Sequence, residues 1–312
     1  MLSFSWTYAQ QTAQYSNYQM NNFLLNPAVA GSYSYWNARA GFRLQWLGVE
    51  GAPRTYFATV HGPLKQKPKR SKSKRGQKQG VNHGVGFTAS FDEVGAFSYA
   101  GFSGSYAAHL PLNKIWTLSL GASLGMKQTS INTNDLNFQQ YPTDPSIVGG
   151  IYTETKPDVN LGGWLYSKTA LIGFSARQIL QNDVNIGGEV EENNLSRLYN
   201  HYYFTGGVKL EVNYDWVFVP SVMLQAVRPA PLQVDLNTTF WYKSKVGLGL
   251  SYRHLDAIYA TVEYVHNSML EISYAYDLPL SGLSKYNSGT HEVIVGIRWN
   301  RKGEAPCPAK YW

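Results

Sequence analysis

Apolar and polar residues alternate by twos along many short stretches of this chain, and this alternation is the feature that most constrains its fold. In 117–126 the even positions are Leu, Leu, Ala, Leu and Met, whereas the odd positions are Thr, Ser, Gly, Ser and Gly. The same alternation is present in 83–91 and in 246–253. Because successive side chains of a strand point to opposite faces, each stretch has one face suited to lipid and one suited to a polar lumen. The pattern predicts a transmembrane β-barrel.

Composition agrees with this prediction. The chain has 23 Tyr, 9 Trp and 29 Gly with only 15% charged residues, which is typical of a barrel with aromatic girdles. A soluble β-sandwich is the alternative all-β fold, but it would need one shared core and water-facing polar faces. No run approaches the roughly 20 apolar residues of a membrane helix, so a helical membrane protein is excluded.

Counting the alternating stretches predicts a closed antiparallel barrel of about fourteen strands, an even number as single-chain bacterial barrels have. We expect Trp116, Leu118, Leu120, Val293, Val295 and Ile297 to face lipid. The connections at 111–114, 167–168, 214–215, 243–244 and 267–268 are tight and alternate with long ones at 129–157, 179–201 and 278–290. Short turns are periplasmic in such barrels, so both termini are expected in the periplasm of an outer-membrane protein. The strand boundaries expected from the pattern are 37–46, 54–64, 83–91, 96–110, 115–128, 158–166, 169–178, 202–213, 216–228, 233–242, 245–254, 258–266, 269–277 and 291–300.

Four regions follow from this layout. Residues 1–9 resemble the remnant of an export signal, because a short apolar run ends at Thr7-Tyr8-Ala9, a small-x-small pattern. Residues 10–36 form a segment expected in or beneath the lumen, 37–300 form the barrel, and 301–312 form a polar periplasmic tail. The N-terminal segment has no apolar face for lipid and carries turn-forming residues, so Tyr15, Asn26, Pro27 and Gly31 are expected to belong to a plug.

The inward positions of the strands carry charges of both signs. A lumen with balanced charges can neutralise itself through ion pairs across the barrel, whereas a selective channel would need a ring of one sign. We therefore expect a plugged or filled lumen, with a water-filled pore as the alternative. The expected lumen charge network consists of Arg39, Arg43, Arg177, Lys209, Glu211, Asp235, Arg253, Glu263, Glu271, Asp277, Glu292 and Arg298.

One connection on the periplasmic side holds the excess positive charge. Without its eight basic residues the chain has 19 Lys and Arg against 20 Asp and Glu, so the net charge of +7 comes from this loop. It is either a solvated hairpin linker or a contact for anionic lipid headgroups or an acidic periplasmic partner. Nucleic acid is not an expected partner, because an exported barrel meets no genome. The basic residues are Lys65, Lys67, Lys69, Arg70, Lys72, Lys74, Arg75 and Lys78.

The sequence offers little support for catalysis. The seven histidines are scattered without paired spacing on a shared strand face, and the single cysteine is remote from them. We expect no catalytic residues, no cofactor-binding residues and no metal site, and therefore a protein that is not an enzyme.

Several motifs resemble one family of outer-membrane proteins. They are QYSNYQMNNFLLNPAVAGS at 14–32, RLQW at 43–46, APRTYFATVHGPL at 52–64, GVGFTASFDEVGAFS at 84–98, YAYDLPLSGL at 274–283 and THEVIVGIRW at 290–299. Together they resemble the PorP/SprF family of the type IX secretion system, over nearly the whole chain. The basic loop is longer than the family pattern needs.

The resemblance implies a non-enzymatic barrel that serves protein secretion. Some members of the family work with the periplasmic ring of the secretion machine. Others pair with a large secreted adhesin, support its export and hold its C-terminal domain at the cell surface, as in gliding motility. The expected partners are accordingly a secreted surface protein, the type IX secretion machinery and outer-membrane lipid. A structural subunit linking the outer membrane to the ring, and a passive solute channel, remain as alternatives.

Overall fold

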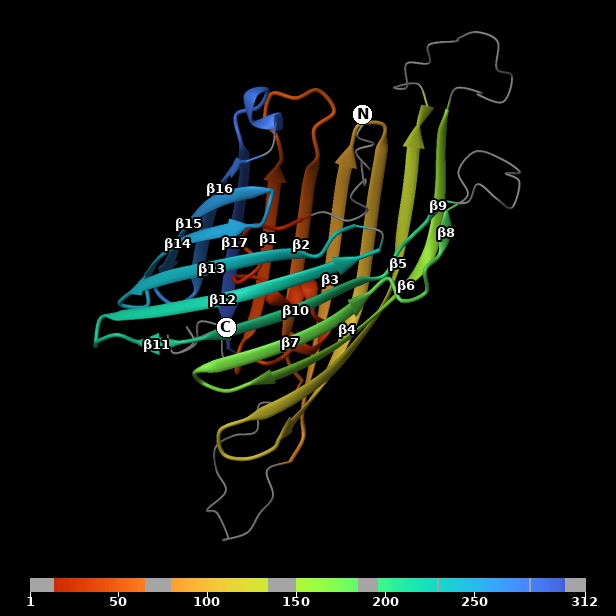
Figure 1. Cartoon of the computed structure of the whole chain (residues 1–312). Coiled ribbons are helices and arrows are strands. Elements are labelled where there is room, and N and C mark those ends of the chain that lie inside the picture. Colours follow the sequence, from red (N-terminus) through yellow and green to blue (C-terminus); the bar gives the residue numbers. More distant parts are fainter. Residues whose placement is uncertain are drawn as a thin grey trace, which may run out of the picture.

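The strands of the computed structural model close into an antiparallel barrel (Figure 1). The structure describes residues 14–64, 80–133, 150–184, 196–228, 230–280 and 282–300. The strands of the barrel are β1 (Trp36–Leu44), β2 (Arg54–Pro63), β3 (Asn82–Val94), β4 (Phe97–Pro111), β5 (Thr117–Asn132), β6 (Ile151–Tyr166), β7 (Ala170–Arg177), β10 (His201–Val208), β11 (Leu210–Glu211), β12 (Trp216–Val227), β13 (Gln233–Tyr242), β14 (Val246–Arg253), β15 (Ala257–His266), β16 (Leu270–Pro279) and β17 (Thr290–Trp299).

The strand order follows the chain around the barrel, and the first and last strands pair to close it. Each strand pairs with its neighbour in the chain, and β1 then pairs with β17 from Trp36 opposite Trp299 to Leu44 opposite His291. The short strand β11 continues β10 along the same edge of β12, so the two occupy one position in the barrel. The described residues therefore form a closed barrel of 14 strands, which confirms the predicted fold class.

Burial alternates along the strands as the sequence pattern predicts. In β15 every second residue from Ala257 onward is buried and the residues between them are exposed. Leu120, Val295 and Ile297 are about half exposed and point outward, as expected of side chains that face lipid. No helix in the described part of the chain is long and apolar enough to cross a membrane.

The connections differ between the two ends of the barrel. One end, here called the turn end, carries the tight turns after β4, β6, β11, β13 and β15. In two of these turns both central residues adopt positive φ, namely Lys243 with Ser244 and Asn267 with Ser268, as in the two-residue hairpin turns whose twist matches that of the strands. The opposite end, here called the loop end, carries the connections after β1, β5, β7, β12 and β16, which include the short 3-10 helix η3 (Gly282–Lys285), together with the short turns after β3 and β14.

Two strand boundaries differ from the prediction by four residues or more. Strand β6 begins at Ile151 rather than at 158, and β5 extends to Asn132. The connection 179–201 contains an additional two-stranded hairpin, β8 (Asp183–Val184) with β9 (Ser196–Arg197). Residues 152–156 are polar apart from Tyr152, and no lipid-facing row marks them as strand. These parts of the sheet project beyond the alternating region and were therefore not visible as apolar alternation.

Candidate functional site: a plugged lumen with a buried charge network

Residues 14–35, here called the plug, lie inside the barrel, and almost all of them are buried. Gln14 contacts Gln233 and Arg253 near the loop end, and Tyr35 stacks against Arg298 near the turn end. Between them the chain forms α1 (Asn22–Leu25) and the 3-10 helix η1 (Pro27–Val29), drawn in red inside the barrel in Figure 1. The segment contains the residues expected in the plug, namely Tyr15, Asn26, Pro27 and Gly31.

Asn26 sets the turn at the middle of the plug. Its side-chain oxygen accepts a hydrogen bond from the Ala28 N–H at 2.9 Å, and Pro27 supplies the fixed φ that favours the first position of η1. The Asn26 amide also donates to the backbone carbonyls of Gly163 and Phe174, each at 3.1 Å. One side chain therefore shapes the plug and attaches it to β6 and β7.

Glycines of the strands make room for the plug. A Cβ at Gly121 in β5 would lie 2.5 Å from the Ala28 backbone. A Cβ at Gly84 in β3 would overlap the plug backbone, and one at Gly162 in β6 would overlap the Asn26 side chain. These three glycines occupy inward positions of the alternating pattern. Their lack of a side chain is required for the plug to approach the wall this closely.

Hydroxyl groups of the strands satisfy the carbonyls of the plug. Ser119 donates to the Ala28 carbonyl at 2.7 Å, and Ser175 donates to the Leu25 carbonyl at 2.8 Å. Buried backbone groups without such partners would be costly. Burial also raises the pKa of the Tyr15 phenol, because the charged form would lose its hydration. Polar strand residues therefore stabilise a buried segment that has little regular structure of its own.

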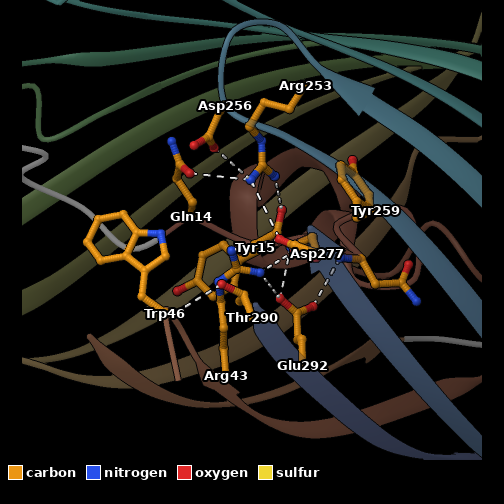
Figure 2. Close-up of polar contacts among 12 residues, drawn as sticks. Gln14, Tyr15, Arg43, Trp46, Arg253, Asp256, Tyr259, Asp277, Thr290 and Glu292 are labelled. Atoms are coloured by element: carbon orange, nitrogen blue, oxygen red, sulfur yellow. Dashed lines mark hydrogen bonds and ion pairs between the residues drawn. The ribbon is translucent and has the colours of Figure 1, made fainter. Parts of the chain in front are cut away.

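Arg43 is the centre of a charge cluster near the loop end (Figure 2). Its guanidinium donates to Asp277 at 2.9 Å and to Glu292 at 3.2 Å, and also to the hydroxyl of Ser16 in the plug. The backbone N–H groups of Ser16 and Asn17 donate to the two oxygens of Glu292, at 2.8 and 3.0 Å. The strands β1, β16 and β17 thus bind the plug through one arginine and two carboxylates.

Arg253 forms a second part of this cluster (Figure 2). Its Nε lies 3.2 Å from both oxygens of Asp235, and its Nη2 donates to the Tyr15 carbonyl at 3.2 Å. Nη1 donates to the Gln14 side chain at 3.3 Å. The guanidinium also lies 5.2 Å from the ring centre of Tyr259, which fits a cation–π contact. The plug therefore supplies acceptors to both arginines of this cluster, Arg43 and Arg253.

A third group lies toward the turn end. Glu271 binds Arg39 and Arg298 together, so that one carboxylate of β16 joins guanidinium groups of β1 and β17. Glu263 in β15 accepts a hydrogen bond from the Asn17 amide at 3.1 Å. The plug thus contacts charged residues along the depth of the lumen rather than at one level.

Nine of the twelve charges expected in the lumen join these three groups. They are Arg39, Arg43, Arg253 and Arg298 together with Asp235, Glu263, Glu271, Asp277 and Glu292. Each arginine contacts at least one carboxylate, and the plug adds neutral donors and acceptors. Each pair requires both of its partners, because removing one of them leaves an uncompensated buried charge.

Arg177 lies apart from these groups, near the loop end. It lines a cavity between the plug and β3 to β7, together with Asp92, Lys127 and Asp158. The last three were missed by the sequence analysis, although each continues the inward parity of its strand. Lys127, for example, follows the inward positions from 117 to 125 by one further step. Extending the alternation past the apolar region would have found them.

Glu211 was wrongly expected in the lumen. Its side chain is 69% exposed and pairs at 3.2 Å with Lys209, whose side chain is 14% exposed. The two-residue strand β11 ends directly after Glu211, at the turn end, so the carboxylate reaches the barrel surface rather than the network. The Lys209–Glu211 pair is therefore separate from the lumen charges described above.

A second cavity lies beside the plug near the turn end. It is lined by the plug residues Tyr18, Tyr33 and Tyr35 and by wall residues that include Trp241 and Arg298. Among the described residues no group of three or more His, Cys, Asp and Glu is placed to hold a metal ion. The basic residues of 65–78, the segment 1–9 and the tail 301–312 lie outside the described residues. The described ends of β2 and β3 place the basic connection at the turn end.

Comparison with solved structures finds a barrel of similar fold. The solved structure of the Pseudomonas putida toluene transporter TodX has a TM-score of 0.50 at 9% identity, covering 89% of this chain and 92% of that chain. A Pseudomonas aeruginosa FadL homologue has a TM-score of 0.47 at 8% identity, covering 88% of this chain and 91% of that chain. No curated protein matches the sequence. At this identity the likeness to TodX shows the fold alone.

The family is identified from the sequence rather than from the structural comparison. The family model described as type IX secretion system membrane protein PorP/SprF matches residues 7–297. This range includes the plug and all strands of the barrel except the last two residues of β17, and it confirms the resemblance found in the motifs. The chain therefore belongs to the PorP/SprF family of type IX secretion system membrane proteins.

Proposed function

We propose that this outer-membrane component of type IX secretion binds the C-terminal domain of a secreted surface protein at its loop end. It supports export of that protein and anchors it at the cell surface, acting by binding rather than by catalysis. The proposal places the loop end outside the cell and the turn end in the periplasm, as in barrels with short periplasmic turns. Family membership supports the secretion role.

The observation that carries the proposal is three strongly exposed apolar side chains at the loop end. Tyr286, which follows η3, is 78% exposed, and Leu255, in the turn between β14 and β15, is 77% exposed. Ile151, at the projecting start of β6, is 71% exposed. We take these side chains as contacts for another protein, because surfaces that bind proteins expose large apolar side chains.

The plug favours binding at this surface over passage through the barrel. It is attached to the wall by hydrogen bonds at several depths, some of them to charged wall residues. A passive solute channel would need this segment to leave or to admit solute beside it. Single-channel recording of the purified barrel tests this alternative directly, and robust conductance without a protein partner would contradict the proposed function.

Purification of the native barrel from its own outer membrane, followed by mass spectrometry, tests the proposal. We expect a large secreted surface protein to copurify. Tyr286→Ser should reduce its recovery, whereas Tyr214→Ser is the matched control, because Tyr214 is a fully exposed tyrosine at the turn end. Equal loss in both variants would argue against binding at the loop end.

The basic connection favours a second candidate, a subunit that links the outer membrane to the periplasmic secretion ring. Its eight Lys and Arg residues fall in a connection at the turn end. An electrostatic contact there would weaken when the loop is neutralised, and the effect would be larger at low salt, where screening is weak. Recovery of periplasmic ring proteins that depends on this loop would favour the second candidate, whereas capture of the surface protein should not depend on it.

A further inference from the structure

Strand β6 projects past one of its two neighbours at the loop end. It pairs with β5 along its whole length, from Ile151 opposite Asn132 to Tyr166 opposite Thr117. It pairs with β7 only from Leu161 to Tyr166. Residues 151–160 therefore have a sheet edge that β7 does not cover, and Figure 1 shows β5 and β6 rising beside the shorter β7.

Two contacts identify which backbone groups face this edge. The Val159 carbonyl accepts a hydrogen bond from the Ile179 N–H at 3.1 Å, and the Pro157 carbonyl accepts one from the Asn182 side chain at 2.6 Å. In an antiparallel strand the N–H and C=O of one residue point to the same neighbour, and the direction alternates along the chain. The odd-numbered residues of β6 therefore face the uncovered edge.

Three residues above these contacts retain a backbone donor and acceptor on the edge. They are Ile151, Thr153 and Thr155, and no described residue pairs with their backbone groups. Pro157 has no N–H, so it ends this row before the strand enters the barrel wall. The edge is thus a short ladder of three residues at the loop end, limited on one side by a proline.

We propose that this edge accepts a β-strand from the C-terminal domain of the secreted partner. The inference rests on the proposed function and names the surface that performs it. An added strand would satisfy the three N–H and three C=O groups and continue the outer sheet. The exposed Ile151 side chain would supply an apolar contact beside this ladder, while Glu154 and Lys156, paired at 2.8 Å, leave no net charge to repel a partner strand.

The length and composition of the edge indicate which kind of strand could pair with it. Three edge-facing residues match an extended partner segment of about five residues, because only alternate residues bond across a pair. Exposed sheet edges also invite pairing between identical chains, and proteins limit this with Lys and Pro on the edge. Here Pro157 limits the ladder to three residues. The ladder lies at the loop end, where the proposed function places the secreted domain, so we assign it to a strand of that domain, and pairing with a second copy of the barrel is the competing outcome of the test.

Two proline substitutions, here called the proline pair, test whether the edge forms backbone hydrogen bonds with a partner strand. They leave the hydrogen bonds between β6 and β5 intact. In the double variant Thr153→Pro, Thr155→Pro, both lost N–H groups face the open edge, and the pairing with β5 uses the even residues. Pro157 shows that the strand tolerates proline at this parity. The matched control is Thr153→Val, Thr155→Val, which removes the same hydroxyls and keeps both N–H groups.

Recovery of the secreted protein with the native barrel is the first measurement. We expect the proline pair to lower the affinity by about tenfold or more and the valine pair by less than about twofold, because only the proline pair removes two backbone hydrogen bonds. Unchanged recovery with the proline pair would overturn the assignment of the edge. Absence of any secreted protein from the unsubstituted barrel would contradict the proposed function itself, which distinguishes the two failures.

Amide hydrogen exchange on the unsubstituted barrel gives a second measurement that does not depend on the variants folding. Exchange at Ile151, Thr153 and Thr155 should be fast in the free barrel and slow in the complex. Protection already present in the free barrel, or equal exchange in both states, would overturn the proposal. So would a dimer of the barrel that the proline pair abolishes, because a second copy would then occupy the edge.

Discussion

Arg43 in β1 and Asp277 in β16 form a buried ion pair of 2.9 Å that passes over β17, the strand lying between them. The pair therefore crosses the place where the first and last strands close the barrel. The hydroxyl of Ser16 in the plug donates to the same Asp277 oxygen at 2.5 Å. Closure of the barrel and attachment of the plug thus share one carboxylate, and a change at either residue should affect both.

Replacing Arg43 tests this shared role. Arg43→Gln leaves Glu292 without its cation, and leaves Asp277 with Arg253 alone at 3.9 Å, in a site where both carboxylates are almost fully buried. We expect the free energy of unfolding to fall by about 3–5 kcal/mol, the usual cost of breaking a buried pair. Urea unfolding of the refolded barrel in detergent measures it. Arg54→Gln is the control, because Arg54 is exposed near the same end of β2, and a similar loss in both variants would contradict the prediction.

The inward glycines give a prediction about the plug alone. Gly121→Ala would place a Cβ 2.5 Å from the Ala28 backbone, whereas a Cβ at Gly104 in β4 meets no atom within 4 Å. We expect Gly121→Ala to displace the plug and make residues 14–35 accessible to protease in an otherwise folded barrel, and Gly104→Ala to leave them protected. Equal protection in both variants would show that the plug can shift without leaving the lumen.

The alternation in the sequence predicts much of this structure because it has one physical cause. Side chains that face lipid must be apolar, so the opposite positions are identified as inward whatever their chemistry. Arg43, Arg253 and Glu271 were recognised in this way. Their partners along the barrel circumference were not predictable, because pairing depends on strand register and on the depth of each residue.

Where the strands leave lipid, this constraint disappears. Residues 151–157 of β6 need no apolar face, so the sequence analysis placed them in a loop. Glu211 shows the converse error, because its parity is inward but the strand ends beside it at the barrel surface. The plug was expected from its turn residues and its place before β1, whereas its attachment through Asn26 and the inward glycines became apparent only from the three-dimensional contacts.

In the described barrel wall, only one position is divided between two strand pieces, β10 and β11, and the gap between them lies opposite Pro220 of β12. Pairing of β10 with β12 stops at Gly207 opposite Ser221 and resumes in β11 at Leu210 opposite Phe218. The same number of residues separates the two pairs on each side, so nothing is inserted and the register is unchanged. The interruption lies opposite Pro220, whose ring nitrogen has no hydrogen to donate.

Restoring the donor should therefore close the ladder. Pro220→Val is expected to stabilise the barrel by about 0.5–1.5 kcal/mol, the net contribution of one backbone hydrogen bond, and the new amide at position 220, which the register places opposite Val208, should exchange slowly. The matched control is Pro157→Val, which adds an N–H on the uncovered edge of β6 and gains no partner within the barrel wall. Urea midpoints at unchanged m-values measure both variants. A gain at Pro157 equal to that at Pro220 would mean that the effect comes from loss of the proline ring rather than from the restored hydrogen bond.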